Sequence, residues 1–267
     1  MIQFKSFGIT DIGRVRERNE DHILLGNELS NSGTVIGGAS QNCLAIVADG
    51  IGGAPGGKEA SFTTLSTFRK TIEEASQHPV QLETLRLAME SSNSAVYQTG
   101  QTQPELHGLG STLAGCYLSS TQGEEKCIIF HAGDSRIYRY RSGFLKCLTR
   151  DHTVGEYWLA KGEIPWEEIQ TSPYRFQLAQ YIGKVKCDYS LEMGPILEVG
   201  DLIIACTDGL HDMLNQDVME SIIQTHLPDL ELTANKLVEK VYQQGAKDNI
   251  SMILISVQAS TETPREQ

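Results

Sequence analysis

Short apolar runs alternate with polar, glycine-rich segments along most of the chain, and this pattern predicts many strands. The run at 43–48 has the length of a strand and is closely bounded by glycines, which favours a buried strand over a helix. Similar runs predict strands at residues 4–10, 22–25, 112–118, 126–132, 136–140, 144–148, 189–193, 202–207 and 250–257. The connections within 112–148 are short, so these four strands are predicted to form an antiparallel meander.

Apolar residues at helical spacing predict two helices after the glycine-rich turn, at 62–75 and 82–96. Two more are predicted near 216–225 and 230–244. Helix pairs placed before and after sheet meanders favour an α+β fold in which helices cover sheets. Residues 27–40 and 99–110 are predicted to be loops, the first with an edge strand at 34–36.

Residues 153–186 have a weak apolar pattern with short helical patches beside Pro165 and Pro173, and are predicted to be a lobe inserted over the sheet. Because the chain shows no repeat and no linker, residues 1–259 are predicted to form a single domain. The polar residues 260–267 are predicted to be a disordered tail.

The composition narrows the function. At 40% hydrophobic residues the 267-residue chain can bury a full core, and its net charge of −12 argues against a general nucleic-acid binder. No apolar segment approaches the roughly 20 residues that span a bilayer, and the N-terminus does not resemble a signal peptide, so a cytoplasmic protein is expected. The six cysteines include no C-x-x-C pair and are expected to be reduced core residues.

Aspartates mark one end of four predicted strands: Asp49, Asp134, Asp208 and Asp248. A lone carboxylate at the mouth of a buried strand is costly, whereas four of them indicate a shared cation. With Glu20 they form an all-oxygen ligand set, which suits Mg²⁺ or Mn²⁺. Two such ions about 3.5–4 Å apart activate water in phosphate-ester hydrolysis. No histidine or cysteine pair accompanies the carboxylates, so zinc is disfavoured.

Three arginines, Arg14, Arg16 and Arg18, precede Glu20. The planar guanidinium donates two parallel hydrogen bonds to phosphate, so one of them could complete a phosphate site. The alternative is that residues 10–21, which carry both charge signs, form only a solvated turn.

Residues 52–58 fit the pattern G-x-x-x-x-G-K of a nucleotide-binding loop. That motif continues with a serine or threonine that holds Mg²⁺, but here Glu59 follows. Asp49 at the start of the loop would also repel a nucleotide, so this alternative is disfavoured.

Seven short motifs follow one another along the chain. They are Thr10-Asp11-x-Gly13-x-x-Arg16-x-x-Asn19-Glu20-Asp21, Val47-Ala48-Asp49-Gly50-Ile51-Gly52-Gly53, Gly110-Ser111-Thr112, Gly133-Asp134-Ser135-Arg136, Leu148-Thr149-x-Asp151-His152, Thr207-Asp208-Gly209-Leu210 and Lys247-Asp248-Asn249-Ile250-Ser251. Each is weak evidence alone. Together, in this order, they make residues 4–257 resemble the bacterial metal-dependent protein phosphatases of the type 2C class.

This resemblance implies a four-layer α-β-β-α sandwich with two central antiparallel sheets, and it identifies residues 153–186 as a variable flap that contributes to substrate choice. It implies that the protein hydrolyses phosphoserine and phosphothreonine in proteins by a metal-activated water, without a phosphoenzyme. The implied partners are phosphoproteins, targets of a bacterial serine/threonine kinase, and nothing in the sequence demands more than a monomer.

The resemblance also assigns roles to individual residues. It implies that Asp49 bridges two Mn²⁺ or Mg²⁺ ions, with Asp208 and Asp248 on the first ion and the Gly50 carbonyl and Glu20 on the second. A third, weaker ion of bacterial members would map to Asp134 together with Asp208.

Arg16 would hold the substrate phosphate, and Asp21 and Asn249 would lie behind the metal ligands. Two positions depart from the family pattern: Ile51 and Ala54 stand where some members carry a histidine. The source of the proton for the leaving group therefore stays open.

Four histidines that adjoin the motifs are expected to be hydrogen-bonded neighbours rather than ligands: His22, His131, His152 and His211. Arg136 is expected to form an internal ion pair. Two other functions stay open: a non-catalytic phosphoprotein-binding module of the same fold, and an enzyme for small phosphate esters or nucleotides.

Overall fold

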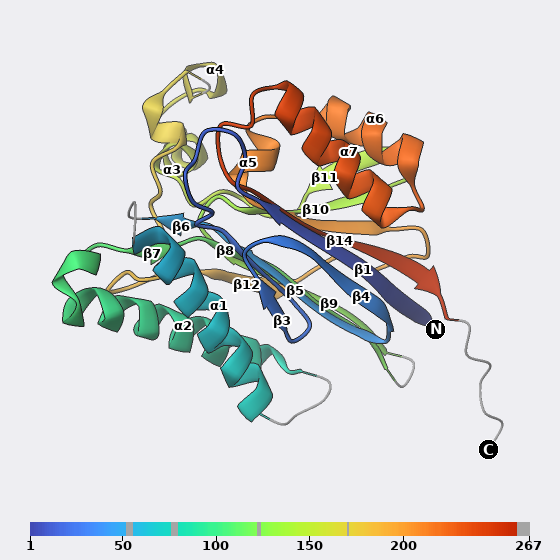
Figure 1. The fold of residues 1–267 in the computed structure, drawn as a ribbon, viewed down its shortest axis with the longest axis horizontal. Helices are drawn as coiled ribbons and strands as arrows, with labels where there is room; N and C mark the ends of the chain where they lie inside the picture. Colours follow the sequence, from blue (N-terminus) through green and yellow to red (C-terminus); the bar gives the residue numbers. More distant parts are fainter. Residues whose placement is uncertain (52–55, 76–79, 122–123, 170, 261–267) are drawn as a thin grey trace.

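Two antiparallel six-stranded sheets pack face to face, and a pair of helices covers the outer face of each (Figure 1). This computed structural model describes residues 1–51, 56–75, 80–121, 124–169 and 171–260. The four layers confirm the predicted α-β-β-α sandwich. The features predicted for residues 52–55, including Ala54, for the turn at 122–123 and for the tail at 261–267 lie outside the described residues.

The first sheet contains both end strands of the described chain. Its strands, in spatial order, are β11 (Phe144–Cys147), β10 (Arg136–Arg141), β13 (Leu202–Cys206), β14 (Ile250–Ala259), β1 (Ile2–Asp11) and β4 (Gly33–Ser40). Helices α6 (Gln216–His226) and α7 (Leu230–Gln243) pack on its outer face. The segment predicted to be a loop at 27–40 thus contributes a complete edge strand, β4, and a short strand β3 (Glu28–Ser30) in the other sheet.

The second sheet is ordered β12 (Ser190–Met193), β9 (Glu124–Ala132), β8 (Leu113–Thr121), β5 (Asn42–Ala48), β2 (His22–Leu25) and β3 (Glu28–Ser30). Helices α1 (Gly56–Glu74) and α2 (Leu82–Thr102) cover it. Helix α2 continues beyond the predicted end near residue 96 into the segment expected to be a loop. The short 3₁₀ helix η1 (Pro104–Leu106) follows it.

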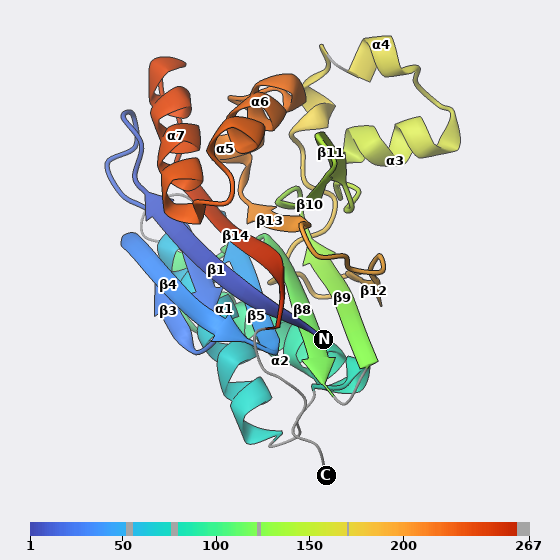
Figure 2. The same ribbon diagram turned by 90° about the vertical axis from the view of Figure 1, so that its right-hand side faces the viewer.

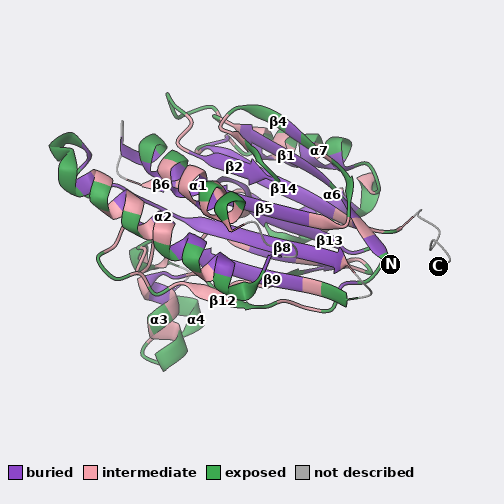
Figure 3. Cartoon of the chain, turned by 90° about the horizontal axis from the view of Figure 1, so that it is seen from below, coloured by how far each residue is buried: buried purple, intermediate pink, exposed green. Residues whose placement is uncertain are grey.

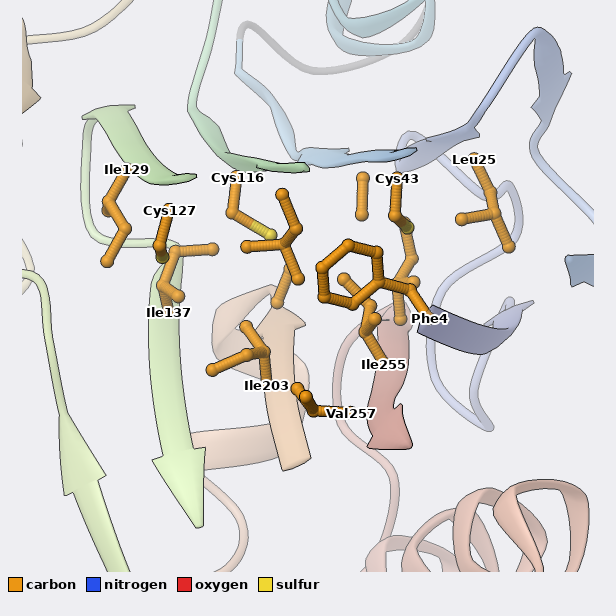
Figure 4. Close-up of a cluster of buried hydrophobic side chains, with 14 of the residues drawn as sticks. Phe4, Leu25, Cys43, Cys116, Cys127, Ile129, Ile137, Ile203, Ile255 and Val257 are labelled. Carbon is orange, nitrogen blue, oxygen red and sulfur yellow. The ribbon is translucent and has the colours of Figure 1, made fainter. Parts of the chain in front are cut away.

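The apolar runs are continuous because the central strands bury both faces (Figure 3). In β5, Cys43, Ala45 and Val47 face the core between the sheets, shown in Figure 4. The alternate residues Leu44 and Ile46 pack under α1 and α2. Successive side chains of a strand point to opposite faces, so a strand between two apolar layers has no polar positions.

The chain changes sheets between β9 and β10. Strands β8 and β9 pair, and so do β10 and β11, but β10 pairs with β13 of the first sheet and not with β9. The predicted continuous four-stranded meander is therefore wrong. The crossing turn contains Gly133, whose φ of +110° is one that glycine adopts readily, and it brings Asp134 to the edge where the two sheets meet.

Three short helices lie within residues 153–186, the segment predicted to be an inserted lobe: α3 (Val154–Lys161), α4 (Trp166–Ile169) and the 3₁₀ helix η2 (Pro173–Arg175). They project from one end of the sandwich (Figure 2). At the same end, β6 (Gly50–Ile51) pairs with β7 (Gly110–Ser111), and α5 (Asp208–His211), which was not predicted, follows β13. None of the described helices is long and apolar enough to cross a membrane.

Candidate active site

Asp49 leaves β5 in a fixed position at the mouth of the strand. Its backbone N–H donates to Thr112 Oγ1 at 2.9 Å, and its carbonyl accepts hydrogen bonds from Thr112 N at 2.8 Å and Ser111 Oγ at 3.0 Å. Thr112 belongs to a motif that was noted in the sequence without a role. Its small hydroxyl, at the first residue of the predicted strand 112–118, holds the backbone of Asp49 in place.

Four other aspartates surround Asp49. Burial raises the pKa of Asp49 well above its usual value, and the charges of Asp21, Asp208, Asp134 and Asp248 raise it further. The structure thus brings together carboxylates from four separate strand ends and from the loop before β2. Ionised together and without a cation, these groups would repel one another in a poorly solvated site.

Asp208 and Asp134 show the same effect. Burial raises the pKa of Asp208, although His211 opposes the shift. Burial and the charge of Asp208 raise the pKa of Asp134 to about 8. Asp208 Oδ1 is buried and has no hydrogen-bond partner among the described residues. A buried oxygen without a partner is an energetic cost that a ligand could remove.

Asp21 lies behind this group and is almost fully buried. Thr207 Oγ1 donates a hydrogen bond to Asp21 Oδ2 at 2.9 Å. Burial raises the pKa of Asp21 to about 7, while a hydrogen bond to Ser251 lowers it. Asp21 therefore links β14 and the end of β13 behind Asp208.

Arg16 reaches the same group from the loop after β1. Its Nη2 atom lies 2.5 Å from Asp248 Oδ2, and the N–H of Asn249 donates to Asp248 Oδ1 at 2.8 Å. The hydrogen bond with Asp248, followed by the charges of Asp248, Asp49 and Glu20, raises the pKa of Arg16 against the opposing effect of burial. About half of its side chain, 53%, stays exposed, so the guanidinium also faces solvent.

Glu20 and the Gly50 carbonyl meet at Gly57, near the start of α1. A Cβ atom on Gly57 would lie 2.6 Å from Glu20 Oε2 and 2.7 Å from the Gly50 carbonyl oxygen. Only a glycine leaves these two oxygens undisturbed. The sequence did not identify Gly57 as a site residue, and its only signal was the glycine-rich segment that resembles a nucleotide-binding loop.

Asn249 holds the 12–20 loop onto the end of β14. Its Nδ2 atom donates to the carbonyls of Ile12 at 2.9 Å and Arg18 at 3.0 Å, and its Oδ1 atom accepts from Glu20 N at 2.9 Å. Arg16 and Glu20 both belong to this loop. Asn249 thus positions both Arg16 and Glu20 by holding the backbone of their loop.

The donors have the chemistry of a site for a hard cation. Carboxylates and a backbone carbonyl are the ligands that Mg²⁺ and Mn²⁺ prefer, and Asp208 Oδ1 has no competing partner among the described residues. Within the described part of the chain, no three or more His, Cys, Asp or Glu side chains form a ready metal-binding group. These residue types therefore fit Mg²⁺ or Mn²⁺ chemically.

The four neighbouring histidines are hydrogen-bonded, and Arg136 forms the predicted internal ion pair. His22 Nδ1 lies 2.8 Å from Ser61 Oγ, and His211 Nε2 lies 3.1 Å from the Asp134 carbonyl. Arg136 makes a two-pronged ion pair with Asp151, at 2.8 and 2.7 Å. The remaining two histidines are also hydrogen-bonded: His131 to the Arg150 carbonyl and His152 to Ser190.

The family model described as protein phosphatase 2C matches residues 32–243. The chain belongs to the protein phosphatase 2C family. The serine/threonine phosphatase stp of Listeria monocytogenes is 28% identical over 250 residues, which cover 92% of this chain and 93% of that protein. The predicted family and the predicted class of enzyme, a protein phosphatase, are confirmed.

Solved structures of the protein phosphatase 2C type share the sandwich. The Streptococcus agalactiae serine/threonine phosphatase superposes with a TM-score of 0.79 at 27% identity, covering 96% of this chain and 100% of that one. The Mycobacterium tuberculosis serine/threonine phosphatase PstP/Ppp gives a TM-score of 0.78 at 25% identity, with 96% and 100% coverage. The similarity covers nearly the whole of this chain in both comparisons.

Proposed function

We propose that this protein phosphatase 2C member hydrolyses phosphoserine and phosphothreonine in proteins, using Mn²⁺ or Mg²⁺. The convergence of strand-end carboxylates on Asp49 carries the proposal. The names of the relatives, all serine/threonine phosphatases among those described above, support the substrate class. Two ions would be held, and a third is proposed for Asp134 with Asp208.

The proposed ligands divide between two positions. Asp49 would contribute to both, Asp208 and Asp248 to the first, and Glu20 with the Gly50 carbonyl to the second. When bound, the cations would lower the pKa of water and neutralise charge on the phosphate oxygens. The raised pKa values of Asp49, Asp208 and Asp134 support this arrangement, because added positive charge favours the ionised carboxylates.

Arg16 is proposed to bind the substrate phosphate. Its guanidinium lies at the carboxylate group and is half exposed, so it can donate to a phosphate that approaches from solvent. Asp248 would then exchange part of its ion pair with Arg16 for the cation. The Ile51 side chain carries no proton that it can donate to the leaving alkoxide. Solvent water is therefore proposed as the source of that proton.

We further propose that residues 1–259 form one catalytic domain, with residues 153–186 as the substrate-selecting flap. We also propose that the protein is cytoplasmic and monomeric. Its proposed substrates are phosphoproteins made by a bacterial serine/threonine kinase.

The test is phosphate release from a phosphothreonine peptide with EDTA, Mg²⁺ or Mn²⁺. We expect release only with metal, and a loss of at least about 100-fold in Asp208→Asn, which keeps the shape of the side chain but removes its charge. The matched control is Asp217→Asn, on an exposed position of α6. Thermal unfolding with and without Mn²⁺ gives a second readout, since a ligand of the folded state raises Tm.

Two results would contradict the proposal. Full activity in Asp208→Asn would remove this residue from the reaction. No release with any metal, from a protein whose Tm still rises with Mn²⁺, would instead favour the non-catalytic phosphoprotein-binding module.

A further inference from the structure

A cavity of about 440 Å³ lies next to the segment that leads into β7, and its lining includes none of the clustered carboxylates. Its walls are the end of α2, residues 107–109 and residues 181–186. We call it the lysine pocket, after Lys184 and Lys186. The polar and aromatic side chains that line it are Tyr97, Gln101, His107, Tyr181, Lys184 and Lys186.

The charge of the lysine pocket is opposite to that of the whole molecule. Its lining includes two lysines and a histidine but no carboxylate, although the chain has a net charge of −12. Lys186 is exposed and makes no ion pair within the described part of the chain. Lys184 Nζ donates to the Ala179 carbonyl and lies 5.7 Å from the centre of the Tyr181 ring. Among the described residues, no carboxylate forms an ion pair with either ammonium group.

The segment that carries the lysines is held rigidly against α2. Asn93 Oδ1 accepts a hydrogen bond from Gly183 N at 2.8 Å, and Asn93 Nδ2 donates to the Lys184 carbonyl at 3.0 Å. Gly183 has a φ of +108°, and a Cβ atom there would lie 2.8 Å from Val96 Cγ1. The backbone of the pocket is thus formed before any ligand arrives, which lowers the entropic cost of binding.

The chemistry of the lining selects the ligand. Lysine ammonium groups bind phosphate as point charges, and tyrosine hydroxyl and glutamine amide groups supply further donors. We infer that the lysine pocket binds a small molecule that carries a phosphate group, with the phosphate between Lys184 and Lys186. The phosphate is either free or attached to a nucleoside, whose ring would lie against Tyr97 or Tyr181.

The segment that carries the lysines is hydrogen-bonded to strand β7, which in turn contacts Asp49. Ile182 and Ser111 exchange backbone hydrogen bonds of 2.8 and 2.9 Å, and Ser111 Oγ also donates to the Asp49 carbonyl. A ligand in the lysine pocket would therefore contact the segment next to β7, on the side away from Asp49.

The experiment is a calorimetric titration of the full chain with sodium phosphate and, separately, with AMP. EDTA is present so that the carboxylates at Asp49 repel anions, and the ionic strength is held constant because lysine–phosphate attraction is screened by salt. We expect saturable binding to one site. Lys186→Glu should weaken it at least about tenfold, which corresponds to about 1.4 kcal/mol. The matched control Lys5→Glu, an exposed lysine on β1, should change it less than about twofold.

Further variants separate the two sites. Binding that persists in Arg16→Ala and is weakened in Lys186→Ala belongs to the lysine pocket, and unchanged melting of each variant shows that it is folded. Tighter binding of AMP than of phosphate would identify a nucleotide, and equal affinity would identify free phosphate. Binding that is lost in Arg16→Ala but kept in Lys186→Glu, or no saturable binding of either probe, overturns the inference. Neither result touches the proposed phosphatase activity, which is measured separately with metal.

Discussion

Arg16 and Asp248 form an ion pair in which Nη2 and Oδ2 lie 2.5 Å apart. The two residues have different proposed roles, since Arg16 would bind phosphate and Asp248 a cation. With those roles, their contact would place the substrate's phosphate within one side chain of the proposed metal ligands.

Replacing Arg16 with alanine should weaken substrate binding more than metal binding. A charge-assisted hydrogen bond contributes about 1.5–3 kcal/mol, so KM for a phosphothreonine peptide should rise at least about tenfold. The Mn²⁺-induced rise in Tm should persist, because Asp248 is left free. Arg14→Ala, in the same loop and packed on Tyr242, is the control and should change KM less than about twofold. An unchanged KM in Arg16→Ala would remove Arg16 from phosphate binding.

Gly57→Ala should disturb the second proposed metal position without unfolding the protein. The new Cβ would displace the Glu20 carboxylate or the Gly50 carbonyl, which would lie 2.6 and 2.7 Å from it. Activity at limiting Mn²⁺ should fall at least about tenfold, because disturbing the orientation of metal ligands weakens metal binding by about this factor. Gly38→Ala is the control, since a Cβ there meets nothing within 4 Å. Equal activity of the two variants would show that Glu20 tolerates the displacement.

His152 should make stability depend on pH. Burial, followed by the neighbouring His131, lowers the pKa of His152 to about 4, while Asp151 and Asp188 oppose the shift. A histidine with a lowered pKa contributes full stability above its unfolded pKa of about 6.5, and this contribution is lost as the pH falls toward the folded value. The free energy of unfolding should therefore fall by about 1–2 kcal/mol between about pH 7.5 and 5 on account of this residue.

His152→Phe isolates that contribution, since the carboxylates that also titrate are present in both proteins. Urea unfolding at both pH values should show a variant that is less stable than the natural protein near pH 7.5, because the hydrogen bond to Ser190 is lost. The difference should shrink or reverse near pH 5. A stability difference that does not change with pH would contradict the lowered pKa.

Much of the fold could be predicted from the sequence because the strands are apolar on both faces. Residues 43–48 were predicted as a buried strand, and β5 (Asn42–Ala48) is that strand with one more residue. The change of sheet after β9 could not be predicted. Residues 133–135 have the composition of a tight hairpin turn, and only the pairing of β10 with β13, which is distant in sequence, decides that the chain crosses over.

The clustering of Asp49 and Asp208 could be predicted, because aspartates at the ends of apolar strands stand out in the sequence. It was not predictable where the role depends on close packing. Gly57 matters because two oxygens from other segments approach its Cα. Ser61 and Thr207 are small polar residues whose type gives no sign of a role. Their contacts exist only in the folded structure, where the Ser61 hydroxyl donates to the Glu20 carbonyl and Thr207 to Asp21 in the loop before β2.

The pairing of β1 with β14 has a practical consequence for anyone who attaches something to this protein. The pair runs from Asp11 and Ile250, beside the carboxylate group, to Ile2 and Ala259 at the opposite end (Figure 1). Nine steps of a strand cover about 30 Å. A fluorescent dye, an affinity tag or a surface tether joined to either strand at its outer end would lie on the far side of the sandwich, away from the carboxylate group.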